Sequence, residues 1–283
     1  MKLNRRIFTL ATTATLATTA ALALSASMSF AGEALDRVMA SGTLKVATDA
    51  NWAPQSFIND DNKMDGFDVD VAREIAKRLG VEVEFVTPSW DIITAGRWNG
   101  RWDLSVGSMT PTKSRAKVLA FPGVYYFTPA SIAVHKDSPF QKIADLNGKE
   151  VGAGTATTFE LYLLHDLQID AEGVPAFEYQ LTAENKSYKD STAAMDDLRL
   201  GDGVRLNGMV GSLPAILSAI KANYPLRVLG DPVFYEPLAL AIDLGDAEFN
   251  DKLAAILADM KADGTLSDLS VKWYGIDYAS TRQ

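Results

Sequence analysis

Residues 66–80 read Gly66-Phe67-Asp68-Val69-Asp70-Val71-Ala72-Arg73-Glu74-Ile75-Ala76-Lys77-Arg78-Leu79-Gly80. The apolar residues Val69, Ala72, Ile75, Ala76 and Leu79 recur on one helical face, which predicts a helix from about Asp68 to Leu79 that stops at Gly80. In the next segment Val81, Val83 and Phe85 alternate with glutamates, which predicts a half-buried strand. A helix followed by such a strand is typical of an α/β fold.

The same alternation of short apolar runs and amphipathic stretches continues along the chain. Further strands are predicted at residues 44–47, 102–107, 130–134 and 151–153, and helices at 90–96 and 214–222. A long amphipathic helix and a shorter one follow residue 247. The pattern predicts the α/β class for the whole chain after its N-terminal segment.

The N-terminus has the features of an export signal. Lys2, Arg5 and Arg6 precede a Thr-, Ala- and Leu-rich run without charge, and Ser29-Phe30-Ala31 places small residues before a cleavage point. We predict a cleaved secretory signal peptide at residues 1–31 rather than a membrane anchor, because the run is short and no basic stop follows it. Arg5-Arg6 resembles part of a twin-arginine signal; we favour the general secretory route, and both routes remain open.

Composition narrows the class of partner. The 283 residues carry a formal net charge of −9, and the predicted signal holds only positive charges, so the exported part is more acidic still. Such a protein is a poor match for nucleic acid or anionic membranes. The absence of cysteine excludes disulfides, thiolate catalysis and a lipid-modified N-terminal cysteine. We expect a monomer, free in a bacterial periplasm and not lipid-anchored.

A candidate anion site lies in Gly107-Ser108-Met109-Thr110-Pro111-Thr112-Lys113-Ser114-Arg115. Thr112 is predicted to cap a helix whose first backbone N–H groups face the end of the preceding strand. Arg115, one turn into that helix, offers a planar fork for a carboxylate. These residues alone fit a carboxylate clamp and a capped helix with a solvated arginine equally well.

A second glycine-rich turn follows a strand at Gly152-Ala153-Gly154-Thr155-Ala156-Thr157-Thr158. A dinucleotide-binding reading fails because Thr157 stands where the third glycine is needed. The two histidines, His135 and His165, have neither metal nor triad spacing, and residues 59–65 lack the pattern of a calcium loop. We therefore expect no metal and no cofactor.

Four blocks in this order, the loop from Asp49 to Pro54, the Gly66 helix, Ser89-Trp90-Asp91 and the segment ending at Arg115, resemble periplasmic solute-binding proteins of family 3. These are type II periplasmic binding proteins of amino-acid ABC importers. Ala262-Asp263-Gly264-Thr265-Leu266 and Trp273-Tyr274-Gly275 match the family's C-terminal helices. The resemblance covers Glu33 to Asp277.

The resemblance implies a two-lobed α/β fold with two hinge crossovers and a central ligand cleft. Lobe 1 would comprise residues 33–127 plus 240–283, and lobe 2 residues 132–233. The crossovers would lie near residues 127–131 and 234–239. Closure of the lobes on a ligand would signal to an inner-membrane ABC permease.

By position, the resemblance assigns ligand-binding roles within the cleft. Thr110 and Arg115 match carboxylate-binding residues, and Gly107 and Ser108 match positions whose backbone lines the same site. Trp52 and Trp90 match aromatic rings over the ligand side chain, with lobe packing as the alternative. Thr157 and Thr158 match the turn that holds the carboxylate from lobe 2. Asp49 matches a position that meets a polar group of the ligand, with turn capping as the alternative.

Ser212 departs from the family pattern. Aligned through Pro214, it replaces the aspartate that usually pairs with a ligand's α-ammonium group. A neutral hydroxyl there leaves a buried cation without a counter-charge, so we expect an amino-acid relative with an altered amine. A standard α-amino acid would need Asp49 or Glu160 as its anionic partner.

The sequence thus predicts a binding protein, with no catalytic residue, that delivers a small carboxylate-bearing solute to an ABC permease. The alternative is a periplasmic cyclohexadienyl dehydratase-like enzyme on the same fold, which would need a general acid in the cleft. The residues around Ser212, namely Leu213, Pro214 and Ala215, supply none. A sensing module of a signalling receptor is disfavoured because no membrane or kinase segment follows.

Overall fold

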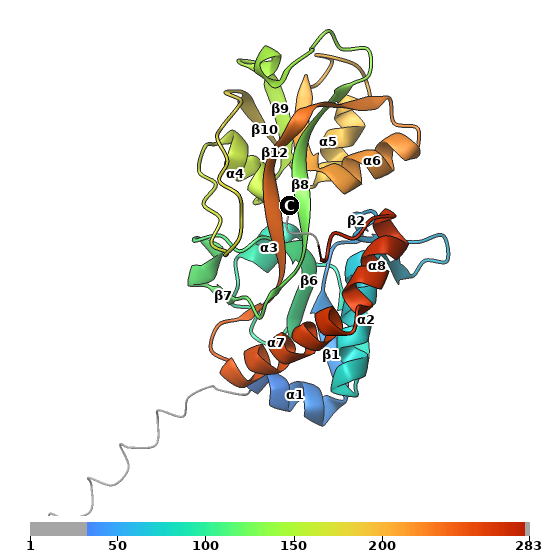
Figure 1. Ribbon diagram of the computed structural model, residues 1–283, viewed down its shortest axis with the longest axis vertical. Helices are drawn as coiled ribbons and strands as arrows, with labels where there is room; N and C mark the ends of the chain where they lie inside the picture. Colours follow the sequence, from blue (N-terminus) through green and yellow to red (C-terminus); the bar gives the residue numbers. More distant parts are fainter. Residues whose placement is uncertain (1–32, 281–283) are drawn as a thin grey trace, which may run out of the picture. The chain divides into compact units, whose positions relative to one another are not determined.

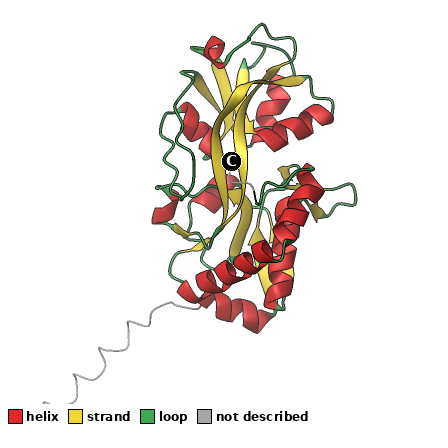
Figure 2. Cartoon of the chain, viewed as in Figure 1, coloured by secondary structure: helices red, strands yellow, loops and turns green. Residues whose placement is uncertain are grey.

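The computed structural model describes residues 33–280, so the predicted signal peptide at residues 1–31 lies outside the described residues. In the described part, helices and strands alternate along the chain (Figures 1 and 2). No helix within residues 33–280 is both long and apolar enough to span a bilayer. The α/β class expected from the sequence is confirmed.

The main sheet joins strands in the order β10-β9-β11-β8-β12-β6-β1-β5, with β7 (Leu119–Ala120) paired to β12. Parallel pairing links β1 with β5 and β6 at one end, and β9 with β10 and β11 at the other. These strands are β1 (Thr43–Ala47), β5 (Glu82–Val86), β6 (Leu104–Met109), β8 (Val124–His135), β9 (Glu150–Gly154), β10 (Glu184–Tyr188), β11 (Gly208–Ser212) and β12 (Leu226–Asp243).

The long strands β8 and β12 connect the two parallel groups. β12 pairs antiparallel with β8 over most of its length and with β6 near its end, while β8 also pairs antiparallel with β11. The register between β8 and β12 shifts between Leu229 and Phe234. Because both strands belong to both groups, the chain forms two α/β lobes joined by two extended crossovers (Figure 1).

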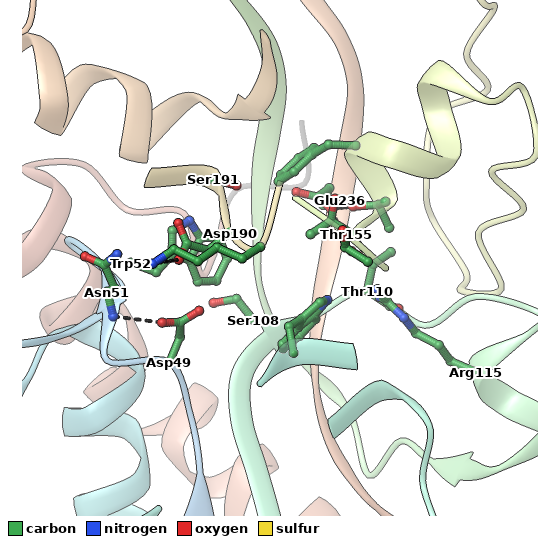
Figure 3. A pocket seen from close by; sticks show the side chains of 15 residues that line it. Asp49, Asn51, Trp52, Ser108, Thr110, Arg115, Thr155, Asp190, Ser191 and Glu236 are labelled. Atoms are coloured by element: carbon green, nitrogen blue, oxygen red, sulfur yellow. Dashed lines mark hydrogen bonds and ion pairs between the residues drawn. The ribbon is translucent and has the colours of Figure 1, made fainter. Parts of the chain in front are cut away.

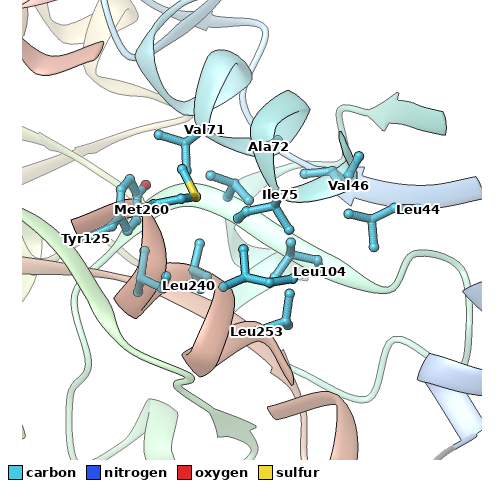
Figure 4. Close-up of a cluster of buried hydrophobic side chains, with 14 of the residues drawn as sticks. Leu44, Val46, Val71, Ala72, Ile75, Leu104, Tyr125, Leu240, Leu253 and Met260 are labelled. Atoms are coloured by element: carbon cyan, nitrogen blue, oxygen red, sulfur yellow. The ribbon is translucent and has the colours of Figure 1, made fainter. Parts of the chain in front are cut away.

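Helices α2 (Phe67–Leu79), α7 (Ala247–Ala262), α8 (Thr265–Tyr274) and α1 (Glu33–Ser41) pack on the group that contains β1. Val71, Ile75 and Ala76 of α2 meet apolar residues of β1, β6, β12 and α7 in one buried cluster (Figure 4). Gly66 is required before α2, because its φ is +125° and a Cβ would lie 2.4 Å from the Gln55 carbonyl oxygen. Gly80 ends the helix in the left-handed conformation, as the sequence predicts.

The second group has its own buried clusters. α4 (Thr158–Leu163) contributes Phe159 and Tyr162 to a cluster with β8, β9 and β12. α5 (Ser191–Leu198) and α6 (Leu213–Lys221) close a further cluster around Met209. Separate cores on the two groups are consistent with lobes that keep their own packing.

Short elements complete the fold. The antiparallel strands β2 (Asn51–Trp52), β3 (Ser56–Ile58) and β4 (Met64–Asp65) form a small second sheet. α3 (Trp90–Thr94) follows β5, and the 3-10 helices η1 (Arg115–Lys117) and η2 (Ile143–Leu146) follow β6 and β8.

One local expectation needs correction. The helix predicted to begin at Thr112 is only η1, although the Thr112 hydroxyl still accepts a hydrogen bond from the Arg115 backbone N–H. Thr112 also forms a β-bridge with Ile169. The lobe and hinge boundaries given above stay predictions.

Candidate functional site

A cavity that is partly open to solvent lies between residues of the two lobes (Figure 3). Eight of the residues selected from the sequence line it: Asp49, Trp52, Trp90, Ser108, Thr110, Arg115, Thr157 and Thr158. The lining also includes residues that the sequence reasoning did not select: Asn51, Thr155, Phe159, Lys189, Asp190, Ser191 and Glu236. Gly107 and Ser212 are not part of the lining.

The Arg115 side chain is 5% exposed and reaches across to the second lobe. Its Nη1 donates to the carbonyl oxygen of Thr110 and its Nη2 to that of Ala156, each over 2.8 Å. Burial lowers the pKa of Arg115 to about 10, and the charge of Glu236 opposes that shift. The guanidinium therefore stays charged at neutral pH, in a place where an anion would be largely desolvated.

The Trp90 ring lies beside this guanidinium. The Cζ atom of Arg115 is 5.5 Å from the ring centroid, and the indole N–H donates to the Ala156 carbonyl over 3.2 Å. Gly107 lies next to the ring, since a Cβ there would be 3.4 Å from Cζ3 of Trp90. These contacts fix the orientation of the ring at the cavity wall.

Trp52 is located on β2 and borders the cavity from the other side (Figure 3). The ring also packs against the cluster around Met209 in the second lobe. Its indole nitrogen is buried and has no hydrogen-bond partner among the described residues. Trp52 thus lines the cavity and packs against the second lobe, and its role over a ligand side chain stays a prediction.

A buried carboxyl group positions Ser108. Asp68 accepts hydrogen bonds from the Tyr125 hydroxyl and the Ser108 hydroxyl, each over 2.7 Å, and the Ser108 backbone N–H donates to the Tyr125 oxygen. Ser108 has a φ of +53°, which a serine rarely adopts without such support. Burial raises the pKa of Asp68 to about 7, although both hydrogen bonds oppose the shift.

Glu236, on β12, enters the cavity beside the predicted carboxylate-binding residues. Its carboxylate accepts hydrogen bonds from the hydroxyl of Thr110, over 2.9 Å, and from that of Thr158. The side chain is 3% exposed, and burial raises its pKa to about 7 against the opposing effects of these bonds and of Arg115. Thr157 caps α4, since its hydroxyl accepts from the backbone N–H of Glu160.

Two further carboxylates lie on the opposite side of the cavity from Arg115 (Figure 3). Asp49 accepts from the Asn51 backbone N–H over 2.7 Å, so its predicted turn-capping role is present as well. Burial raises the pKa of Asp49, and the negative charge of Asp190 raises it further. Asp190 caps α5 through Ala193, and Lys189 lies 3.8 Å from its carboxylate.

Glu160, one of the two anions considered for an ammonium group, is engaged elsewhere. Its carboxylate accepts hydrogen bonds from the Ala156 backbone N–H and from the Ser187 hydroxyl, and it is not part of the cavity lining. Among the described residues, no group of three or more His, Cys, Asp or Glu side chains could hold a metal ion.

The cavity is thus a two-sided pocket, partly open to solvent, with a charged fork, two aromatic rings and several carboxylates. Pockets of this kind between two lobes are typical of proteins that capture small charged solutes. This fold and site define the class of type II periplasmic binding proteins.

The comparisons with known proteins agree with that class. The family described as "Bacterial extracellular solute-binding proteins, family 3" matches residues 44–276. The chain therefore belongs to this family.

Individual relatives cover nearly the whole chain. The L-cystine-binding protein TcyJ of Escherichia coli K12 is 32% identical over 253 residues, which span 88% of this chain and 89% of TcyJ. A crystal structure of a mutant of the arginine-binding protein ArgBP from T. maritima has a TM-score of 0.75 at 27% identity, covering 86% of this chain and 99% of that one. An ancestral amino acid-binding protein, described as a precursor of cyclohexadienyl dehydratase, has a TM-score of 0.73 at 32% identity, covering 85% and 99%.

Proposed function

We propose that this chain is the periplasmic substrate-binding protein of an ABC importer. It binds one small carboxylate-bearing solute, an amino acid or a close relative, between its lobes and delivers it unchanged to an inner-membrane permease. Export by the signal peptide at residues 1–31, cleavage, and a free monomeric form without a lipid anchor belong to the same proposal.

Arg115 is the observation that carries this proposal. Its charged fork is buried at the cavity wall and is held by carbonyl groups, so its charge is available to a ligand carboxylate. The Trp90 ring beside it suits the apolar or cationic part of the same ligand. The names of the relatives, which include proteins for cystine, arginine and histidine, support an amino acid as the ligand class.

A thermal-shift screen of the twenty amino acids and cystine tests the proposal. A ligand at 100 times its dissociation constant stabilises the folded protein by about 2.7 kcal/mol, which is readily measured as a rise in melting temperature. We expect a rise with one amino acid or a small group of related ones. Failure of every amino acid and of simple carboxylic acids to raise the melting temperature would contradict the proposal.

An enzyme related to cyclohexadienyl dehydratase is the second candidate, and one observation favours it. Glu236 is a buried carboxyl group in the cavity with a pKa raised to about 7, which is the property of a general acid at neutral pH. The sequence motif around Ser212 contains no such acid, and Glu236 lies outside that motif. Incubation with prephenate or arogenate decides between the two, because only the enzyme forms phenylpyruvate or phenylalanine.

A further inference from the structure

Glu236 occupies hydrogen-bond donors that a ligand carboxylate would need. The hydroxyls of Thr110 and Thr158 come from opposite lobes, and both donate to the Glu236 carboxylate. These are two of the residues that the sequence assigns to a ligand carboxylate. An incoming carboxylate must therefore share the two hydroxyls with Glu236 or displace it.

Glu236 also offsets the charge of Arg115. The charge of each residue favours the ionised form of the other, and both side chains are at most 5% exposed. At pH 8, above the Glu236 pKa of about 7, a ligand carboxylate next to this pair meets one positive and one negative charge. Because repulsion between charges is strong at a buried site, an anion without a cation of its own gains little there.

A ligand that carries an ammonium group beside its carboxylate resolves this conflict. The two groups of an α-amino acid are separated by one carbon atom, so the anion that receives the ammonium must lie near Arg115. Asp49 and Asp190 lie on the other side of the cavity (Figure 3), and Ser212 is neutral and not part of the lining. Glu236 is the carboxylate on the Arg115 side.

We propose that Glu236 determines the ligand class of this cavity, by supplying the counter-charge for an ammonium group next to the ligand carboxylate. This inference rests on the proposed function as a receptor for carboxylate solutes. It replaces the expectation of an altered amine, because the charge missing at Ser212 is present at Glu236.

The test pairs each primary amino acid with the acid that has the same side chain and no amino group; for cystine this acid is 3,3′-dithiodipropanoic acid. For the wild type, we expect the best-bound amino acid to bind at least about tenfold more tightly than its deaminated partner. In Glu236→Gln, which keeps an oxygen acceptor and loses the charge, we expect that difference to fall to about threefold or less. The exposed Glu184 supplies the matched control, and Glu184→Gln should keep the wild-type preference.

Each outcome bears on one of the two proposals. A wild type that binds deaminated acids as tightly as amino acids overturns the role of Glu236 but leaves the receptor for carboxylate solutes in place. The same holds if folded Glu236→Gln keeps the full preference. If neither class of acid binds the wild type, the proposed function fails and this inference fails with it. Equal binding of both classes of acid by the wild type overturns the role of Glu236 even if Glu236→Gln does not fold, which its melting curve shows.

Discussion

Gln55 donates a hydrogen bond from its side-chain amide to the hydroxyl of Ser212 over 3.1 Å, and both side chains are buried. Gln55 follows β2 in the first lobe, and Ser212 ends β11 in the second. The bond therefore joins the lobes, and the Ser212 hydroxyl is engaged within the protein.

For Ser212→Ala we predict a loss of stability without a comparable loss of binding. Removing the hydroxyl leaves the buried Gln55 amide without this partner, which costs about 1–3 kcal/mol. A melting temperature several degrees lower follows for a chain of this size. Calorimetric titration should give an affinity within about threefold of wild type. An affinity lower by about tenfold or more would mean that the hydroxyl contacts the ligand.

For the tryptophans, we predict that ligand binding shifts the fluorescence emission mainly through Trp52 and Trp90. Both rings line the cavity, whereas Trp98 and Trp102 are buried in a cluster against which Trp90 packs and do not line the cavity, and Trp273 is located on α8. The double variant Trp52→Phe, Trp90→Phe should lose most of the shift, and each ring contact should contribute about 0.5–2 kcal/mol to binding. Trp273→Phe is the control and should respond like wild type. A double variant with the full wild-type shift would show that the two rings only pack.

For Asp68, we predict a pH-dependent contribution to stability. The folded-state pKa of about 7 lies above the ordinary value of 3.8, so between these values the folded protein holds a proton that the unfolded chain releases. The free energy of unfolding should therefore fall as pH rises from about 4 to 7 and level off above. The pKa of Glu236 is also raised, to about 7, so its ionisation lowers the free energy of unfolding in the same direction.

The substitution Asp68→Asn removes the contribution of Asp68 to this fall of the unfolding free energy with rising pH. Between pH 5 and pH 7, the decline in unfolding free energy should be shallower than in wild type by about 2–3 kcal/mol. Denaturant unfolding at several pH values measures it, with Asp60→Asn at an exposed position as the control. Parallel curves for wild type and Asp68→Asn would show that Asp68 is ionised in the folded protein.

Local sequence patterns predicted most of the fold. The helix from about Asp68 to Leu79 is α2 (Phe67–Leu79), because its apolar spacing and its terminal glycines agree with each other. The helix after Thr112 is shorter than predicted: Thr112 caps the Arg115 N–H as expected, but it also bridges to the distant Ile169, and the helical segment covers only Arg115–Lys117. Local patterns carry no information on such a distant partner.

The residues of the candidate site were likewise predictable from the sequence only in part. Arg115 and Trp90 stand in short recognisable motifs, and the structure brings both to the cavity wall. Glu236 was missed because its role depends on Thr110 and Thr158, which only the tertiary fold brings to it. The available signal was a single carboxylate in the otherwise apolar stretch Val233-Phe234-Tyr235-Glu236-Pro237-Leu238. Asp190 was missed because an aspartate that caps α5 looks, in the sequence, like the first residue of any helix on the protein surface.

Calorimetric titration of wild type and Arg115→Ala tests the central claim most directly, using the amino acid that gives the largest thermal shift. We predict one binding site per chain in the wild type. In Arg115→Ala, binding should weaken by about 2–5 kcal/mol, because the ligand carboxylate would be buried without its charged partner. Melting curves should show that the variant is folded. A folded Arg115→Ala that binds within about threefold of the wild-type affinity would contradict the account.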